Sequence, residues 1–146
     1  PRQYVPAPTD SPAGDRAPDA RQIELSEETR IVELIVPALT NAYGTLFAGS
    51  GLSLMTKVAF LTATRSDRRR YMLVSANEID WRRPVMCGQL CEIIGRVIDR
   101  GNRSVTVQVE MLAEDPDGDT ARVCATGKFG LVALKHDPGP MEGNDE

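Results

Sequence analysis

One long helical segment among five strand-like segments is the feature that most limits the possible folds of this chain. Residues 52–64 (LSLMTKVAFLTAT) repeat apolar side chains at helical spacing and are apolar on more than one side, so they predict a buried helix. Segments that are rich in β-branched residues or that alternate in polarity predict strands at residues 29–36, 71–81, 89–98, 104–113 and 120–134. The predicted order is one strand, one helix and four strands in antiparallel succession.

The imbalance between one helix and five strands has a consequence for assembly. A single helix cannot cover both faces of a five-stranded sheet. The sheet is expected to wrap around the helix and to leave an edge and a face for a partner. The sequence therefore predicts an α+β fold, in which a five-stranded antiparallel sheet wraps one long helix, and it predicts a dimer.

Turn-forming residues separate the predicted strands. Residues 82–84 (RRP) break the strand that precedes them, because proline cannot continue a sheet ladder. Residues 100–102 (RGN) predict a tight hairpin turn. Residues 115–119 (DPDGD) predict another turn, in which proline presets φ and glycine takes a dihedral that other residues disfavour.

The composition is that of an ordinary globular domain. The chain has 146 residues, of which 41% are hydrophobic and 26% charged, and one domain is expected. A formal net charge of −4 argues against a nucleic-acid-binding protein, which usually carries a basic domain. No apolar run approaches the ~18 residues that a membrane span needs, and the N-terminus has no hydrophobic signal region, so a cytoplasmic location is expected.

Both ends of the chain have the composition of flexible tails. Residues 1–22 hold five prolines among small and charged residues and are predicted to be disordered. Residues 136–146 (HDPGPMEGNDE) are acidic and rich in glycine and proline, and predict a second flexible tail. The folded domain is therefore expected to span residues 23–135.

The cysteines and the single histidine do not predict a metal site. Cys87, Cys91 and Cys124 contain no Cys-x-x-Cys pair and have no histidine near them, so zinc is not expected. They are predicted to be free, mostly buried thiols in a reducing compartment. His136 is the only histidine and lies in the expected tail, so catalysis by a histidine dyad or triad is not expected either.

Four short motifs, in order, resemble those of the hotdog-fold acyl-CoA thioesterases. Residues 41–49 (NAYGTLFAG), followed by the helix, resemble the family's Asn-x-x-Gly-x-x-Phe-Gly-Gly hallmark. Residues 84–88 (PVMCG) resemble its Pro-Val-x-x-Gly turn, and residues 100–104 (RGNRS) its Val-Gly-Arg-Ser-Ser hairpin. Residues 126–134 (TGKFGLVAL) resemble its last strand. The resemblance covers about residues 30–135. The related hotdog dehydratases rely on a His–Asp pair, which this chain lacks.

The resemblance implies hydrolysis of an acyl-CoA thioester. Coenzyme A is then part of the substrate, and no separate cofactor is needed. Members of the family place the active site across a dimer interface, and their dimers often assemble further, so a homodimer, a dimer of dimers or a trimer of dimers is expected.

The residues before and at the start of the helix fit this chemistry. The free N–H groups at a helix N-terminus can polarise a thioester carbonyl and hold its oxyanion, and Gly49 allows close approach to the backbone. Asn41 is a candidate for orienting substrate or water, and Gly44 and Phe47 are candidate substrate contacts. The alternative is that Asn41 and Gly44 only shape a turn.

One departure from the family pattern affects the mechanism. The family's helix carries Met-Asp, and the aspartate serves as general base or nucleophile. This chain has Met55-Thr56 at that place. A threonine hydroxyl cannot act as a base near pH 7 and could attack only if another group activated it. One alternative is that Thr56 and Asn41 position a water molecule, which gives a slow enzyme.

Two further alternatives bring in another base. Glu78 and Asp80, two residues apart on one strand, share a face and could enter the site, as could a carboxylate of a partner chain. Lys57 could act as a base if burial lowered its pKa, with Ser53 one turn away on the helix.

Coenzyme A carries phosphates, which an acidic protein must bind with local cations. Arg82, Arg83 and Lys128 are the predicted phosphate contacts, because arginine forks suit phosphate geometry. The basic cluster at residues 65–70 is interpreted mainly as a solvated surface.

Three functions are compatible with these observations. The leading one is acyl-CoA hydrolysis. The alternative is an acyl-CoA binding or sensing module with weak or no catalysis, which Thr56 favours. A purely structural assembly protein is the third.

Overall fold

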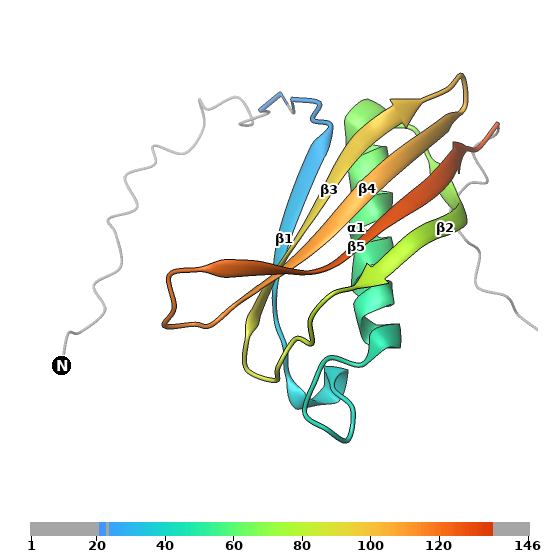
Figure 1. Ribbon diagram of the computed structural model, residues 1–146. Coiled ribbons are helices and arrows are strands. Elements are labelled where there is room, and N and C mark those ends of the chain that lie inside the picture. The colour runs from blue at the N-terminus through green and yellow to red at the C-terminus, as the bar shows by residue number, and fades with distance from the viewer. Residues whose placement is uncertain (1–20, 23, 136–146) are drawn as a thin grey trace, which may run out of the picture.

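Five strands curve around one long helix in the computed structural model, which describes residues 21, 22 and 24–135 (Figure 1). In chain order the elements are β1 (Glu28–Leu34), the short 3-10 helix η1 (Pro37–Leu39), α1 (Ala48–Asp67), β2 (Tyr71–Trp81), β3 (Leu90–Arg100), β4 (Ser104–Glu114) and β5 (Ala121–Ala133). The predicted architecture is confirmed. The expected tails at residues 1–22 and 136–146 lie outside the described residues, apart from Arg21 and Gln22.

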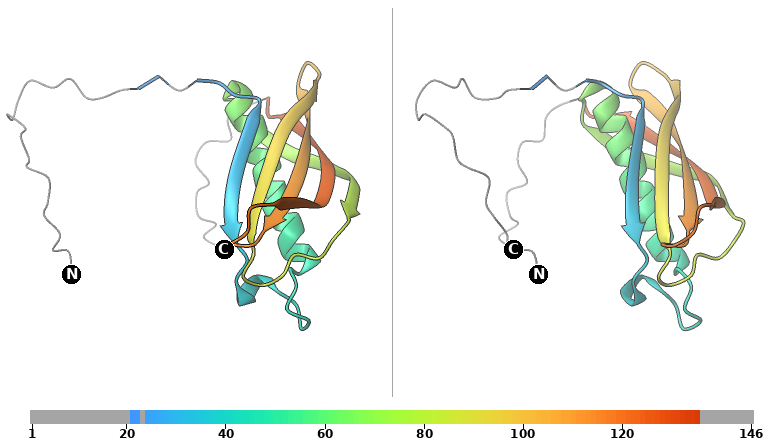
Figure 2. Two further views of the ribbon diagram at one scale, coloured as in Figure 1. Left: turned by 60° about the vertical axis from the view of Figure 1, so that its left-hand side comes forward. Right: turned by 90° about the vertical axis from the view of Figure 1, so that its left-hand side faces the viewer.

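The sheet has the strand order β1-β3-β4-β5-β2, and every neighbouring pair is antiparallel. The predicted succession is wrong at one place, because β2 pairs with β5 and not with β3. Residues 82–89 carry the chain across the N-terminal end of α1, where Leu46 N donates to Val85 O at 2.7 Å and Thr45 bridges Met86. These bonds hold the β2–β3 connection against the loop before α1. The strand order makes β1 and β2 the two edges of the sheet (Figure 2).

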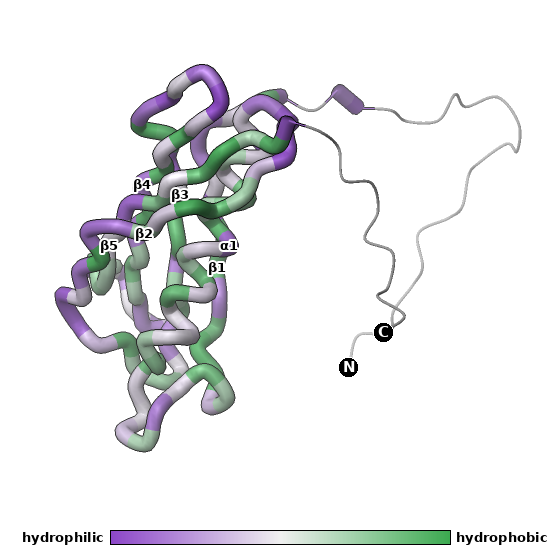
Figure 3. Tube along the Cα trace, turned by 90° about the vertical axis from the view of Figure 1, so that its right-hand side faces the viewer, coloured by the Kyte–Doolittle hydropathy of each residue, from purple (hydrophilic) through white to green (hydrophobic). Residues whose placement is uncertain are grey.

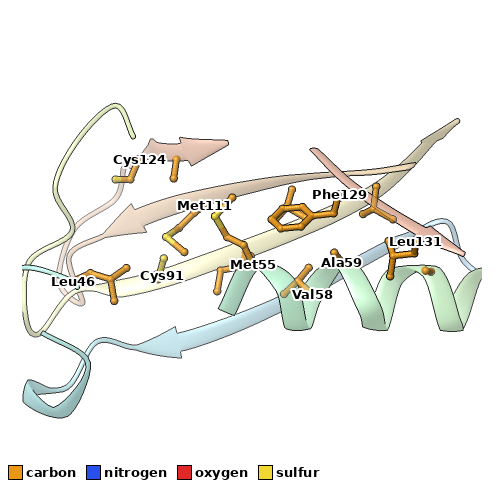
Figure 4. Close-up of a cluster of buried hydrophobic side chains, with 14 of the residues drawn as sticks. Leu46, Met55, Val58, Ala59, Cys91, Met111, Cys124, Phe129 and Leu131 are labelled. Atoms are coloured by element: carbon orange, nitrogen blue, oxygen red, sulfur yellow. The ribbon is translucent and has the colours of Figure 1, made fainter. Parts of the chain in front are cut away.

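The core lies between α1 and the concave face of the sheet. Residues alternate between buried and half-exposed along β4 and most of β5. Figure 3 shows hydrophobic (green) and hydrophilic (purple) residues interspersed along the chain. Met55, Val58 and Ala59 of α1 are fully buried and face Phe129 and Leu131 of β5 (Figure 4). The subunit therefore has a closed, mostly aliphatic core under the helix.

The helix is longer than the sequence pattern predicts. Residues 52–64 were expected, whereas α1 begins at Ala48 and ends at Asp67. The first turn (AGSG) shows no apolar periodicity, and it contains two glycines, which are poor helix formers. Its sequence pattern therefore does not predict a helix. No helix in the described part of the chain is long and apolar enough to cross a bilayer.

Candidate active site at the start of α1

The N-terminal end of α1 is open. Phe47 is the N-cap residue, with an extended backbone, and its side chain forms no capping hydrogen bond; no acidic residue occupies the first turn. The first amide with a backbone acceptor is that of Gly51, which donates to Phe47 O at 3.0 Å. The amides of Ala48, Gly49 and Ser50 therefore have no backbone acceptor within the described residues, and they carry the partial positive charge of the helix end.

The loop before α1 is shaped by Asn41. Its Oδ1 accepts hydrogen bonds from the backbone N–H groups of Tyr43 (2.9 Å) and Thr45 (3.2 Å), and its Nδ2 donates to Thr45 Oγ1 (2.8 Å). Gly44 has φ +76° and donates to Asn41 O at 3.1 Å. Both residues thus shape a turn. The Asn41 amide keeps a second N–H, so its role toward substrate stays a prediction.

A cavity of about 450 Å³ lies beside this helix end. It is lined by Asn41, residues 45–48 and residues 81–84. Loop, helix start and strand end meet here because the β2–β3 connection runs against the loop before α1 (Figure 1). The cavity brings together the predicted residues Asn41, Phe47, Arg82 and Arg83.

Thr56 lies two turns along α1 from Gly49 on the same side of the helix. It is half-buried, and its hydroxyl has no hydrogen-bond partner among the residues that the structure describes. Ser53 and Lys57 are exposed, and no bond joins them in the described structure. Lys57 Nζ lies 4.0 Å from Glu33 Oε1 and its side chain is 59% exposed, so the burial that a lysine base requires is absent in this subunit.

The two carboxylates of β2 point away from the helix. Lys128 alternates along β5 with buried residues that face α1, so it lies on the opposite face of the sheet. Glu78 has φ 53° at a β-bulge and forms an ion pair with Lys128 at 3.0 Å. Asp80 is paired with Arg82 Nε at 3.1 Å. Neither carboxylate of this subunit reaches the start of α1.

Arginines gather next to the cavity. The backbone N–H groups of Arg82 and Arg83 both donate to Cys124 O, at 2.8 and 3.3 Å, which holds these residues beside the start of β5. A second hollow of about 710 Å³ is lined by Arg82, Arg83, Arg122 and Val123. Within the described ranges, neither Arg83 nor Arg122 has a carboxylate partner. These guanidinium groups form a cationic rim.

Arg122 was missed by the sequence analysis, and Lys128 lies elsewhere. Arg122 is an isolated arginine at the start of a strand, and only the fold brings it next to the β2–β3 connection. Lys128 lines a different hollow on the outer face of the sheet, together with its ion-pair partner Glu78. The structure therefore joins Arg122, and not Lys128, to Arg82 and Arg83.

The cysteines are free, and two of the three are buried. Burial, together with the neighbouring Cys124 and Glu33, raises the pKa of the Cys91 thiol to about 12. Burial also raises the pKa of Cys124. Neither thiol ionises near neutral pH, so neither is a nucleophile.

The basic cluster at residues 65–70 lies at the opposite end of α1. Arg65 donates to Thr29 Oγ1 at 3.4 Å, and Arg69 Nε donates to Asp67 Oδ2 at 2.8 Å. Arg68 ends the helix in a left-handed conformation with φ 60°. These contacts give the cluster a structural role at the helix C-terminus.

A helix wrapped by a five-stranded antiparallel sheet is the arrangement of hotdog-type thioesterases. Residues 43–119, more than half of the chain, match the family described as the thioesterase superfamily. The chain belongs to this family.

Several similar proteins are named acyl-CoA hydrolases or acyl-CoA thioesterases. An uncharacterized acyl-CoA thioester hydrolase of Zymomonas mobilis is 28% identical over 115 residues, which cover 79% of this chain and 77% of that one. The crystal structure of an Agrobacterium tumefaciens acyl-CoA hydrolase is 30% identical, with a TM-score of 0.71; the match covers 76% of this chain and 44% of that chain. A hexameric acyl-CoA thioesterase, at 24% identity and a TM-score of 0.71 over 74% of this chain and 69% of that one, shares the fold.

Proposed function

We propose that this protein hydrolyses an acyl-CoA thioester to the free acid and coenzyme A. Water adds to the thioester carbonyl, and the carbon–sulfur bond then breaks, so that the acid keeps the water oxygen and the sulfur leaves as the CoA thiol. The observation that carries the proposal is the set of free amides at Ala48, Gly49 and Ser50, beside a cavity with a cationic rim, in a member of the thioesterase superfamily.

The start of α1 stabilises the charge that develops on the carbonyl oxygen. Free backbone N–H groups that are already oriented can hold an oxyanion without reorganisation. Gly49 is the residue at which a substrate can approach this backbone most closely. Thr56 and Asn41 then position the attacking water, and Gly44 fixes the turn that presents Asn41.

The cationic rim binds the phosphates of coenzyme A. Arg82, Arg83 and Arg122 line one hollow. This hollow adjoins the cavity at the helix start, because Arg82 and Arg83 line both. Among the described residues Arg83 and Arg122 have no carboxylate partner, so their guanidinium groups are free to form bidentate bonds with phosphate oxygens. Phe47 contacts the substrate on the cavity wall.

A second copy of the chain completes the site. β2 pairs only with β5, so its other edge offers unpaired backbone groups within the described structure, and Met72 and Val74 on this strand are 56% and 59% exposed. Apolar, unpaired edges are typical places for strand pairing. We therefore infer a homodimer that assembles further in a reducing cytoplasm, in which a carboxylate of the partner chain faces the substrate.

One observation favours a second function. Thr56 stands where the sequence resemblance expects an aspartate, and its hydroxyl has no described partner that could activate it. Without a base the site would bind acyl-CoA far better than it cleaves it. The alternative is therefore a binding or sensing module that kept the fold and lost the chemistry.

The two functions are separated by placing a carboxylate at position 56. Thr56→Asp supplies the missing acid, and Thr56→Asn is its matched control, because it has nearly the same shape without the charge. Thiol release from acyl-CoA is measured for both variants and for the unmodified protein. A rise of about a hundredfold for Thr56→Asp alone, within the range of general-base contributions, indicates that the natural protein mainly binds. Comparable release by all three proteins indicates that other residues do the chemistry. No release by any of them overturns the hydrolase proposal.

A further inference from the structure

Two aromatic side chains form walls of the cavity beside the start of α1. Phe47 precedes the helix and is 55% exposed, and Trp81 is the last residue of β2 and is 39% exposed. Trp81 lies opposite Ala125 in the sheet register, and Ala125 is fully buried, so the Trp81 side chain points to the concave face, toward α1.

Glycines in the first helical turn make room for both rings. A Cβ atom added to Gly51 would lie 2.5 Å from Cη2 of Trp81, and one added to Gly49 would lie 2.9 Å from Cε1 of Phe47. Such approaches are far shorter than carbon–carbon contact distances. The poor helix-forming sequence of this turn is therefore explained by the two rings that lie against it.

Buried residues of the core lie next to the cavity on the side of the sheet and helix. Met55 is completely buried, Val85 is 2% exposed and Leu46 is 8% exposed, and all three belong to the closed core next to the cavity. The Trp81 ring itself covers the helix at Gly51. An acyl chain that starts at the amides of the first turn therefore meets the indole ring and cannot run under the helix of this subunit.

We propose that Trp81 determines acyl-chain specificity, because its indole ring ends the acyl site and restricts it to short acyl groups, of the size of acetyl to butyryl. This inference rests on the proposed binding of acyl-CoA at the start of α1. The volume of about 450 Å³ fits the thioester end of such a substrate, since small-molecule sites usually measure about 300–1,000 Å³. The exposed indole face supplies apolar contact for the acyl carbons.

Trp81 also provides a direct test of binding, since it is the only tryptophan of the chain. Its fluorescence is followed while the unmodified protein is titrated with coenzyme A and with non-hydrolysable S-propyl and S-decyl thioethers of coenzyme A. We expect the propyl thioether to change the emission strongly, coenzyme A to change it little, and the decyl thioether to bind at least tenfold more weakly than the propyl thioether. Equal affinity for the two thioethers, or no change in emission, overturns the inference.

Two variants test the role of the ring in hydrolysis. Trp81→Ala removes the wall, and Trp81→Phe keeps an aromatic ring and is the matched control. We expect the ratio of kcat/KM for decanoyl-CoA to that for butyryl-CoA to rise at least tenfold in Trp81→Ala and less than threefold in Trp81→Phe. An unchanged ratio in folded Trp81→Ala overturns the inference, and the titration decides the matter if that variant does not fold.

The failure of the inference and that of the proposed hydrolysis give different results. If no acyl-CoA is hydrolysed but Trp81 emission still distinguishes the propyl from the decyl thioether, hydrolysis is wrong and the inference holds for a binding module. If acyl-CoAs are hydrolysed without any dependence on the residue at position 81, the inference alone is wrong.

Discussion

The two ends of α1 are built in opposite ways. At the C-terminal end, Arg68 N donates to Thr64 O at 2.7 Å and closes the helix. Asp67 there accepts hydrogen bonds from Arg69 (2.8 Å), Tyr71 Oη (2.8 Å) and Arg100 (3.1 Å). At the N-terminal end no side chain caps the helix, and the first three amides have no backbone acceptor in the described structure.

The placement of charge makes the contrast sharper. Helix dipoles favour acidic residues in the first turn and basic residues in the last. α1 has no acid in its first turn and carries Asp67 as its last residue. Two arginines compensate the acid at the C-terminal end. Nothing in this subunit's described residues compensates the N-terminal end, so a ligand with partial or full negative charge fits there. Side chains stabilise the C-terminal end of α1, whereas the N-terminal end stays uncapped, as the proposed function requires.

The largest expected effect is at the open end and has opposite signs for stability and turnover. Gly49→Ala adds a Cβ atom 2.9 Å from the Phe47 ring, which must shift toward the cavity. We expect turnover of acyl-CoA to fall by about a hundredfold, as misplacement of a bound substrate by about 1 Å can cause. The free energy of unfolding should rise by up to about 1 kcal/mol, because alanine is a better helix former. Thiol release and urea denaturation measure the two quantities. A fall in both would mean that Gly49 serves the fold and not the site.

The next largest effect is at the closed end and concerns stability alone. Asp67→Asn keeps the shape of the side chain but removes the charge of a carboxylate that accepts four hydrogen bonds. We expect a loss of about 1–2 kcal/mol in the free energy of unfolding, since the site is partly exposed, with kcat and KM unchanged. Partial burial raises the pKa of Asp67, but the hydrogen bonds from Arg69 and Tyr71 outweigh it and hold the pKa below its ordinary value.

The same variant has a defined pH dependence. The pKa of Asp67 is lower in the folded protein than in the unfolded chain. The contribution of the ionised Asp67 to the free energy of unfolding is therefore fully present above the unfolded pKa of about 3.9, and it is lost as the pH falls through the folded pKa. The melting temperatures of the unmodified protein and of Asp67→Asn should therefore differ at pH 7 and converge below about pH 4. A difference that stays constant down to acidic pH would show that packing, and not charge, stabilises this end.

The smallest expected effect concerns the cationic rim. Arg83→Ala and Arg122→Ala should each raise KM for acyl-CoA about fivefold, corresponding to about 1 kcal/mol for an exposed ionic contact, with a smaller dependence on salt than the unmodified protein shows. The matched control is Arg96→Ala, which removes an arginine that is paired with Glu28 and Glu110 on the outer face of the sheet. An equal rise in KM for the control would mean that the effect is one of net charge and not of the rim.

Local patterns predicted the elements well, and contacts between distant segments account for most of what they missed. The predicted strand at residues 71–81 has the bounds of β2, because its β-branched and aromatic residues and the prolyl break after it are local signals. The pairing of β2 with β5 is not local, and the bulge at Glu78 depends on that pairing. The apolar pattern began the helix at Leu52 instead of Ala48, because Gly49 and Gly51 make room for the rings of Phe47 and Trp81 and do not follow helical patterning.

Local sequence patterns predicted only part of the candidate site. The motif at residues 41–49 placed Asn41, Phe47 and Gly49 together because they are close in sequence. Trp81 and Arg122 join them only through the β2–β3 connection and the start of β5, and no sequence spacing marks either residue. Of the alternatives that bring in another base, a carboxylate from the partner chain depends on a contact between subunits, which local sequence patterns do not predict.

The most direct test of the central claim is free-thiol release from a panel of acyl-CoAs, from short to long and with an aromatic member, by the purified unmodified protein. The account predicts turnover of at least ~1 s⁻¹, the lower end of usual enzyme rates, with short acyl groups preferred. No release above background, together with a melting temperature that acyl-CoA still raises, would contradict it and identify an acyl-CoA binding module.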